Sequence, residues 1–95
     1  MNVKHKESDH KGMFYIEDEG GIVAELSYTS QENNIITLDH VEVNKKLSGQ
    51  GIGSKLVKKS VEYARENELK IDPLCPFAEA EFKRHESYSD VQTPS

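Results

Sequence analysis

Three closely spaced glycines are the feature of this sequence that most directly indicates chemistry. Residues 47–54 read LSGQGIGS, with glycine at every second position from 49 to 53. A β-branched run (35–43) precedes this segment, and a stretch with helical spacing (52–67) follows it. A glycine turn between a strand and a helix aims unpaired backbone N–H groups and the positive end of the helix at one point. The segment therefore predicts a binding site for phosphate or pyrophosphate.

Two common nucleotide-binding motifs do not match this turn. The dinucleotide fingerprint needs G-x-G-x-x-G, whereas this sequence has G-x-G-x-G. The mononucleotide loop needs a glycine before its lysine and a hydroxyl after it. Lys55 fits that lysine, but Ser54 and Leu56 occupy the other two positions. A different phosphate-binding loop and a tight turn without any ligand both stay open.

Cys75 and His40 are the two side chains best suited to catalysis. Pro76 is typical of the first position of a helix, which places Cys75 near the N-cap, where the reactive thiolate is favoured. The alternative for Cys75 is a small buried apolar residue. His40 lies in the run 35–43 and can act as a base near neutral pH, the alternative being a packed or surface histidine.

Length and composition indicate one small globular domain, residues 1–95. The sequence is 35% hydrophobic and 31% charged, with a net charge of −5. The cations form no long block, which argues against a nucleic-acid partner. The mild negative charge favours a cationic acceptor such as an amine.

Several features predict a cytoplasmic protein without a membrane partner or a metal site. The sequence has a single cysteine, an N-terminal stretch without the apolar core of a signal sequence, and no apolar run of membrane length. His5 and His10 have no further ligands at compatible spacing, so no metal site is predicted.

The elements that position these residues are expected to form an α+β fold. Strands at 13–17, 22–28 and 35–43 are expected to form an antiparallel meander. A helix (52–67) then leads to a fourth strand (69–74), parallel to the third, in a right-handed βαβ unit. A short second helix begins at Pro76 and ends near Arg84. Residues 1–12 and 89–95 lack apolar periodicity and are expected to be loose.

The third strand is expected to carry His40 into the cleft where it parts from the fourth, next to Cys75. In this strand Ile35, Val41 and Val43 fall on one face, and Ile36, Leu38 and His40 fall on the other. Apolar residues on both faces predict a central strand that is covered above and below.

The glycine turn resembles the pyrophosphate-binding loop of the GNAT superfamily of acetyl-coenzyme A-dependent N-acetyltransferases. In LSGQGIGSKLV, Gly51 and Gly53 match the two small positions of that loop, and Ser48 departs from its usual glutamine or arginine. LDHVEV upstream, and LCPF and FKRH downstream, are similar to the very short single-domain members, which include YidJ-like bacterial proteins. The resemblance covers residues 13–90.

This resemblance implies a minimal GNAT (acyl-CoA N-acyltransferase) fold, with a mixed sheet of an antiparallel meander plus one parallel βαβ unit and two helices. It implies acetyl-coenzyme A as cosubstrate, no metal, and transfer of acetyl to a primary amine, on a small molecule or a protein lysine. In the short subgroup a cysteine and a histidine, which correspond to Cys75 and His40, are the proposed catalytic residues. The expected form is a monomer or weak dimer. The implied cofactor contacts are Val41, Glu42 and Val43 for the pantetheine arm, and Leu47, Ser48, Gly49, Gln50, Gly51, Ile52, Gly53 and Ser54 for the pyrophosphate.

Two departures from the larger GNAT enzymes leave other functions open. The tyrosine that protonates their leaving thiolate corresponds to Phe82, so Cys75 or Tyr88 would have to replace it. The helices that wall their acceptor site have no counterpart here, which predicts an open acceptor side. The alternatives are a coenzyme A-binding module or sensor with little or no transferase activity, and an interaction domain without the cofactor. In an enzyme, backbone N–H groups near Leu74 and Cys75 are expected to stabilise the oxyanion.

Overall fold

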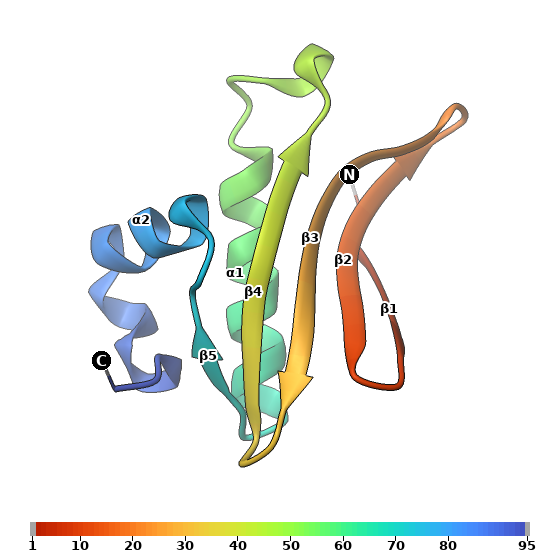
Figure 1. Ribbon diagram of the computed structural model, residues 1–95. Coiled ribbons are helices and arrows are strands. Elements are labelled where there is room, and N and C mark those ends of the chain that lie inside the picture. Colours follow the sequence, from red (N-terminus) through yellow and green to blue (C-terminus); the bar gives the residue numbers. More distant parts are fainter. Residues whose placement is uncertain (1, 95) are drawn as a thin grey trace.

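The computed structural model describes residues 2–94, and its centre is a five-stranded mixed sheet (Figure 1). The strands lie side by side in the order in which they occur in the sequence. The first four pair antiparallel, and the fifth runs parallel to the fourth. The expected α+β fold, with its meander and its single parallel unit, is therefore confirmed. The strands are β1 (Lys4–Ser8), β2 (Lys11–Asp18), β3 (Gly21–Gln31), β4 (Ile35–Val43) and β5 (Lys70–Asp72).

Helix α1 (Ile52–Glu66) connects β4 to β5 and packs on one face of the sheet (Figure 1). Its apolar residues recur every three or four positions, which gives a helix one buried stripe. The opposite face of the sheet, toward the viewer in Figure 1, carries no helix in the part of the chain that the structure describes. The buried stripe consists of Ile52, Gly53, Leu56, Val57, Ser60, Val61 and Ala64.

Helix α2 (Pro76–Arg84) begins and ends where the sequence predicts and lies beside the β5 edge (Figure 1). β5 is shorter than the predicted strand (69–74). Pro73 has no N–H for the ladder, and the Leu74 N–H turns back to the Asp72 carbonyl at 2.9 Å. Within residues 2–94, neither α-helix has the length and apolar character that crossing a membrane requires.

Residues 4–8, which were expected to be loose, form the edge strand β1. All five side chains are exposed, so no apolar alternation marks this strand in the sequence. Pairing with β2 holds it in place. His5 adds to this, because its ring stacks on Phe14 with 4.3 Å between centroids and its Nε2 lies 2.5 Å from Tyr28 Oη.

The C-terminal residues expected to be loose also pack on the sheet and on α1. A short 3-10 helix, η2 (Glu86–Val91), buries Tyr88 and Val91. The Arg65 guanidinium donates to both carboxylate oxygens of Asp90, at 2.9 and 3.0 Å. The next residues reach the outer edge of β5, where Gln92 forms a parallel bridge with Ile71. A 3-10 helix of six residues is too short to show a helical period, so the sequence pattern could not reveal this segment.

A β-bulge in β4 changes which side chains face α1. Ser27 pairs with His40 and Tyr28 pairs with Leu38, so Asp39 is an extra residue. Leu38 is buried before the bulge, and His40 is exposed after it. The expectation of a strand covered on both faces is therefore wrong. The extra residue moves His40 from the face of Leu38 to the open face of the sheet.

An aromatic cluster fills the far end of the sheet, where β1, β2 and β3 meet α1. The Tyr28 ring lies over Gly12, and a Cβ at Gly12 would be 2.3 Å from Tyr28 Cζ. The Tyr28 hydroxyl donates to Glu7 Oε2 at 3.4 Å. Burial, with smaller contributions from Tyr63 and Glu7, raises the pKa of Tyr28, so its hydroxyl stays protonated. The rings of the cluster are His5, Phe14, Tyr28 and Tyr63.

Candidate functional site

The parting of β4 and β5 creates a cleft with unpaired backbone on one wall. The two strands pair only from Ile35 to Thr37, opposite Lys70–Asp72. One further hydrogen bond, from the Cys75 N–H to the Leu38 carbonyl at 3.1 Å, closes the end of the parallel pair. Beyond it β4 continues to Val43, and in the described chain no strand pairs with that side (Figure 1). The backbone of residues 39–43 can therefore bind an extended ligand there.

The glycine turn lies at the outer end of this cleft. Gly49 and Gly51 have φ values of +80° and +71°, which favour glycine. A Cβ at either residue would meet no heavy atom within 4 Å, so the space over both is open. Gly51 is the N-cap of α1, and the first intrahelical bond runs from the Lys55 N–H to the Gly51 carbonyl at 3.1 Å. The N–H groups of residues 52–54 precede that bond, as expected of an anion-binding helix start.

At position 53 a glycine is required for a different reason. A Cβ at Gly53 would lie 2.7 Å from Cζ of Phe77 in α2. Its smallness therefore lets α2 approach the first turn of α1. Gly53 fits a packing role between the two helices, and it also forms part of the cleft wall.

A cavity of about 600 Å³ joins the glycine turn to the free side of β4. The cradle over Gly49 and Gly51 and the unpaired strand backbone fit a phosphate joined to an extended polar arm. Nine of the eleven predicted cofactor-contact residues line this cavity; the exceptions, Glu42 and Gln50, are exposed. The lining residues are Val41, Val43, Leu47, Ser48, Gly49, Gly51, Ile52, Gly53, Ser54, Phe77, Ala80, Glu81 and Arg84.

Sequence reasoning missed the residues that α2 contributes to this wall. Phe77, Ala80, Glu81 and Arg84 occupy positions i, i+3, i+4 and i+7 of α2 and so share one face of the helix. Glu81 is only 2% exposed, although it is charged. The signal in the sequence is its place among Ala78, Phe77 and Phe82, which puts an acid on the apolar side of a short helix.

Cys75 occupies the predicted N-cap of α2, at the closed end of the cleft. Its Sγ accepts the Ala78 N–H at 3.4 Å, and the residue is 7% exposed. Cys75 is not among the residues that line the cavity. It lies three residues beyond the end of β5, where its N–H donates to the Leu38 carbonyl.

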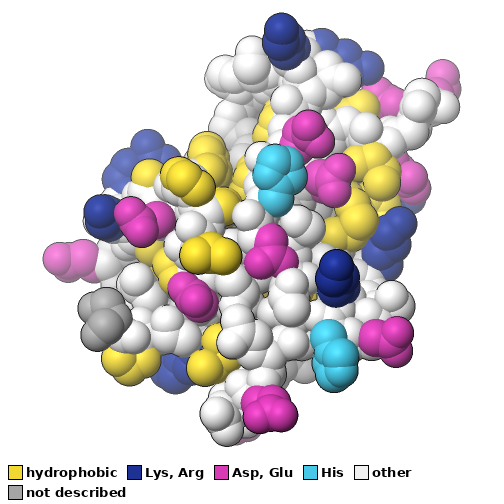
Figure 2. Space-filling model, viewed as in Figure 1, with side chains coloured by type: hydrophobic (Ala, Val, Ile, Leu, Met, Phe, Trp, Pro, Cys, Tyr) yellow, Lys and Arg dark blue, Asp and Glu magenta, His cyan; other side chains and the backbone are white. Residues whose placement is uncertain are grey.

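His40 lies on the open face of the sheet and not in the cavity. Its side chain is 62% exposed, and its Nε2 is 4.0 Å from Glu42 Oε2. The sheet register places Glu25 opposite Glu42, beside the pair that His40 makes with Ser27. Figure 2 shows acidic side chains gathered around a histidine on this face. The structure thus places Cys75 beside Leu38 of β4, two residues from His40. Cys75 lies at the edge of β4 that faces the cleft, and the His40 side chain lies on the open face of the sheet.

The backbone donors expected for an oxyanion already have acceptors. The Leu74 N–H donates to Asp72, and the Cys75 N–H donates to Leu38. The expected oxyanion site at these two groups is therefore wrong for this conformation. Phe82 is buried edge-on against Tyr88, with 5.4 Å between ring centroids, and neither residue lines the cavity.

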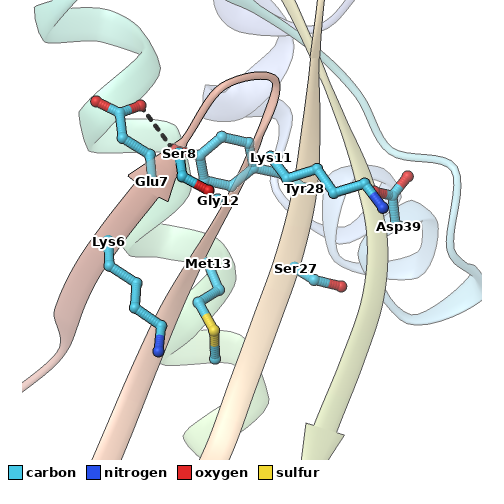
Figure 3. Close-up of a pocket in the computed structure, with 9 residues that line it drawn as sticks. All are labelled: Lys6, Glu7, Ser8, Lys11, Gly12, Met13, Ser27, Tyr28 and Asp39. Carbon is cyan, nitrogen blue, oxygen red and sulfur yellow. Dashed lines mark hydrogen bonds between the residues drawn. The ribbon is translucent and has the colours of Figure 1, made fainter.

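A second hollow, of about 480 Å³, lies over the strands at the other end of the sheet (Figure 3). Figure 3 shows the Lys11 side chain extending across β3 toward Asp39, whereas the Lys6 and Met13 side chains extend toward the bottom of the view. The hollow shares no lining residue with the cleft and presents both cations and anions. Its chemistry therefore selects no class of ligand. The lining residues are Lys6, Glu7, Ser8, Lys11, Gly12, Met13, Ser27, Tyr28 and Asp39.

Comparison with known protein families identifies one match over most of the chain. The model of the family described as GCN5-related N-acetyl-transferase matches residues 13–91. No functionally curated protein matches the sequence.

Solved structures extend this similarity. A proposed GCN5-like N-acetyltransferase from Staphylococcus aureus is 43% identical in sequence. The match covers 99% of this chain and 91% of the Staphylococcus aureus protein, with a TM-score of 0.74. The ribosomal-protein-S18-alanine N-acetyltransferase from Escherichia coli is 14% identical over 82% of this chain and 53% of its own, with a TM-score of 0.65. A proposed streptothricin acetyltransferase from Bacillus anthracis, in complex with acetyl coenzyme A, is 16% identical over 81% of this chain and 46% of its own, with a TM-score of 0.58. This chain spans about half the length of those two enzymes, which share its fold.

Proposed function

The chain belongs to the GCN5-related N-acetyltransferase family, and on this premise we propose that it binds acetyl-coenzyme A in the β4–β5 cleft and transfers acetyl to a primary amine. One observation carries the proposal. The open space over Gly49 and Gly51, at the N-terminus of α1, is continuous with the unpaired side of β4 through a single cavity. A phosphate group and an extended amide-containing arm, joined as in coenzyme A, match these two halves.

Different residues of the cleft would bind different parts of coenzyme A. The turn at 49–54 would take the pyrophosphate through backbone N–H groups, which bind phosphate without a charged side chain. The backbone from Val41 to Val43 would pair with the amides of the pantetheine arm, as a neighbouring strand would. This places the thioester toward Cys75, at the closed end of the cleft.

The open face supplies the acceptor side. His40 is exposed there and would accept the proton of the attacking amine, directly or through water. Glu25, Asp39 and Glu42 favour a cationic amine over a neutral one. A small amine and a protein lysine both fit, because no helix covers this face in the described chain.

Cys75 has two possible roles that predict different products. As an acid, its thiol would protonate the departing coenzyme A thiolate. As a nucleophile, its thiolate would take the acetyl group first and pass it to the amine. Mass spectrometry of protein incubated with acetyl-coenzyme A, without acceptor, separates the two, because only the second leaves one acetyl group on Cys75. Cys75→Ala with undiminished transfer would remove both roles.

Isothermal titration with acetyl-coenzyme A tests the cofactor site. We expect saturable binding by the wild type and a loss of about tenfold or more in Gly51→Val, because the new side chain fills the cradle. Gly21→Val is the matched control: Gly21 also has a positive φ, of +121°, and open space around it, but it is the first residue of β3, after the β2–β3 turn. Both substitutions should cost about 2 kcal/mol of folding free energy. Equal affinity in the two variants, or no binding by folded wild type at millimolar ligand, would overturn the proposal.

A coenzyme A-binding module without transferase activity is the second candidate. It is favoured by the engaged N–H groups of Leu74 and Cys75 and by phenylalanine at position 82. Turnover by the wild type with a panel of amines and lysine peptides, measured as release of free thiol, decides between the two. Tight binding without turnover on any amine would select the module. The cytoplasmic location and the monomeric or weakly dimeric state stay predictions.

A further inference from the structure

Glu81 is a buried acid with one oxygen that the protein does not satisfy. The residue is 2% exposed, and Oε1 has no hydrogen-bond partner among residues 2–94. Its other oxygen accepts from the Arg84 guanidinium. His85 Nε2 lies 3.6 Å from Oε1, beyond a normal hydrogen bond. A buried carboxylate oxygen without a donor is costly, so it calls for a partner.

The location of Glu81 indicates what kind of partner that is. Glu81 lines the cleft cavity from α2, and the wall contributed by β4 presents Val41 and Val43. These two side chains have no donor, so on that wall a donor can come only from the strand backbone or from a molecule bound in the cavity. Rotation about the last side-chain bond of a glutamate is soft, so its carboxylate can turn toward the cavity at little cost.

The charge of Glu81 restricts which part of a ligand it can contact. A carboxylate repels phosphate groups, and the phosphates of coenzyme A belong at the glycine turn under the proposed function. The pantetheine arm is uncharged and carries two amide N–H donors and a hydroxyl. Its donors match an acceptor-only group such as a carboxylate.

We infer that Glu81 contacts the cofactor, with Oε1 accepting a hydrogen bond from an N–H or O–H of the pantetheine arm. This inference rests on the proposed function. Arg84, held by Oε2, lines the same cavity and is 66% exposed, so it lies at the cavity mouth as a cation. Glu81 thus binds the uncharged pantetheine arm through one oxygen and orients the Arg84 guanidinium beside it through the other.

Two ligands and three variants test this contact. Acetyl-coenzyme A contains the arm, and adenosine 3′,5′-bisphosphate contains the nucleotide without it. We expect Glu81→Leu to bind acetyl-coenzyme A about 10- to 100-fold more weakly, as for loss of a hydrogen bond to a charged group, and the bisphosphate within about twofold of wild type. Glu81→Gln keeps an acceptor oxygen and should lose less. Glu79→Gln is the control, because Glu79 pairs with Lys83 at 3.4 Å on the exposed side of the same helix.

Thermal unfolding without ligand separates a binding role from a structural one. A carboxylate kept for ligand binding leaves the empty protein strained, so Glu81→Leu should melt at the same temperature as the wild type or higher. A carboxylate kept only to pair Arg84 and His85 predicts a lower melting temperature and equal weakening of both ligands. That pattern, or unchanged acetyl-coenzyme A binding in Glu81→Leu, would overturn the inference while leaving the proposed function intact. Wild type that binds neither ligand would overturn the proposed function itself.

Discussion

Gly12 and Gly53 each lie beneath the tip of an aromatic ring, at opposite ends of the molecule. A Cβ would be 2.3 Å from Tyr28 Cζ in one case and 2.7 Å from Phe77 Cζ in the other. Tyr28 is 1% exposed, and its hydroxyl bonds to His5 and Glu7. Phe77 is 43% exposed, and its phenyl ring has no polar group. The contact of a glycine with a ring therefore holds Tyr28 in a fixed position in the sheet, whereas the Phe77 ring in the cleft wall remains free to move.

This difference separates the residues that hold the fold from those that shape the site. The cluster under Tyr28 satisfies its polar atoms within the protein, through hydrogen bonds among β1, β3 and α1. The cleft beside Phe77 keeps unpaired strand backbone, open glycines and the unsatisfied oxygen of Glu81. Unsatisfied groups gather where a ligand is expected, and the following changes test that division.

Gly12→Ala should have the largest effect, on stability alone. The Tyr28 ring cannot move aside without breaking its hydroxyl contacts, so overpacking should cost about 3 kcal/mol. Urea unfolding measures the loss, and acetyl-coenzyme A affinity of the folded fraction should not change. Gly20→Ala is the control, because its Cβ would meet only Asp18 Oδ1, at 3.5 Å. A cost at Gly12 as small as that at Gly20 would mean that the ring is not fixed.

Tyr28→Phe tests the anchor itself. The ring stays over Gly12, but the bonds to His5 and Glu7 are lost, which should cost about 1–2 kcal/mol in the same unfolding experiment. Tyr15→Phe, on the open face of β2, should change stability by less than about 0.5 kcal/mol. Equal effects of the two substitutions would contradict an anchoring role for the Tyr28 hydroxyl.

Gly53→Ala should weaken the ligand more than the fold. Alanine in a helix gains about 1 kcal/mol over glycine, which offsets displacement of the exposed Phe77 ring. Because that ring lines the cavity, acetyl-coenzyme A affinity should fall about tenfold, or 1.4 kcal/mol. Adding Phe77→Leu should restore binding by making room, as a double-mutant cycle would show. A large loss of stability in Gly53→Ala would mean that the Phe77 ring is held as rigidly over Gly53 as the Tyr28 ring is over Gly12.

The smallest expected effect is a pH dependence at His5. Burial lowers the pKa of His5 below its usual 6.5, against an opposing effect of Glu7. Between the two pKa values the unfolded chain binds the proton more readily, so stability is full above about pH 6.5 and falls as the pH drops toward the folded value. The melting temperature of wild type should therefore fall between pH 7.5 and 5.5 by more than that of His5→Gln. If the melting temperatures of wild type and His5→Gln fell equally with pH, the His5 ring would not be desolvated in the folded protein.

Local spacing predicted the parts of the fold that carry strong periodicity. The apolar stripe of α1, the meander and the start of α2 at Pro76 follow from patterns within a few residues. β1 was missed because all of its side chains are exposed, and η2 because it has only two buried residues in six. Both segments are held by contacts with distant residues, Tyr28 and Arg65, that no local pattern contains.

The candidate site divides in the same way. The glycine turn could be predicted because a strand, its glycines and a helix follow one another in the sequence. The orientation of His40 could not, because the bulge at Asp39 is set by pairing with β3. Glu81 was missed because a charge on a short helix is usually solvated, and its burial depends on α2 packing toward β4 and α1.

The order of the strands has a consequence for folding kinetics. Every strand pairs with its neighbour in the sequence, and turns of a few residues join the first four. Most native contacts then close short loops, so their entropic cost in the transition state is small. Among the pairs of strands β1 to β5, only the step through α1 to β5 closes a longer loop, and this step forms the cleft. We therefore expect the meander to form first and the cleft, which needs the step through α1 to β5, to assemble last.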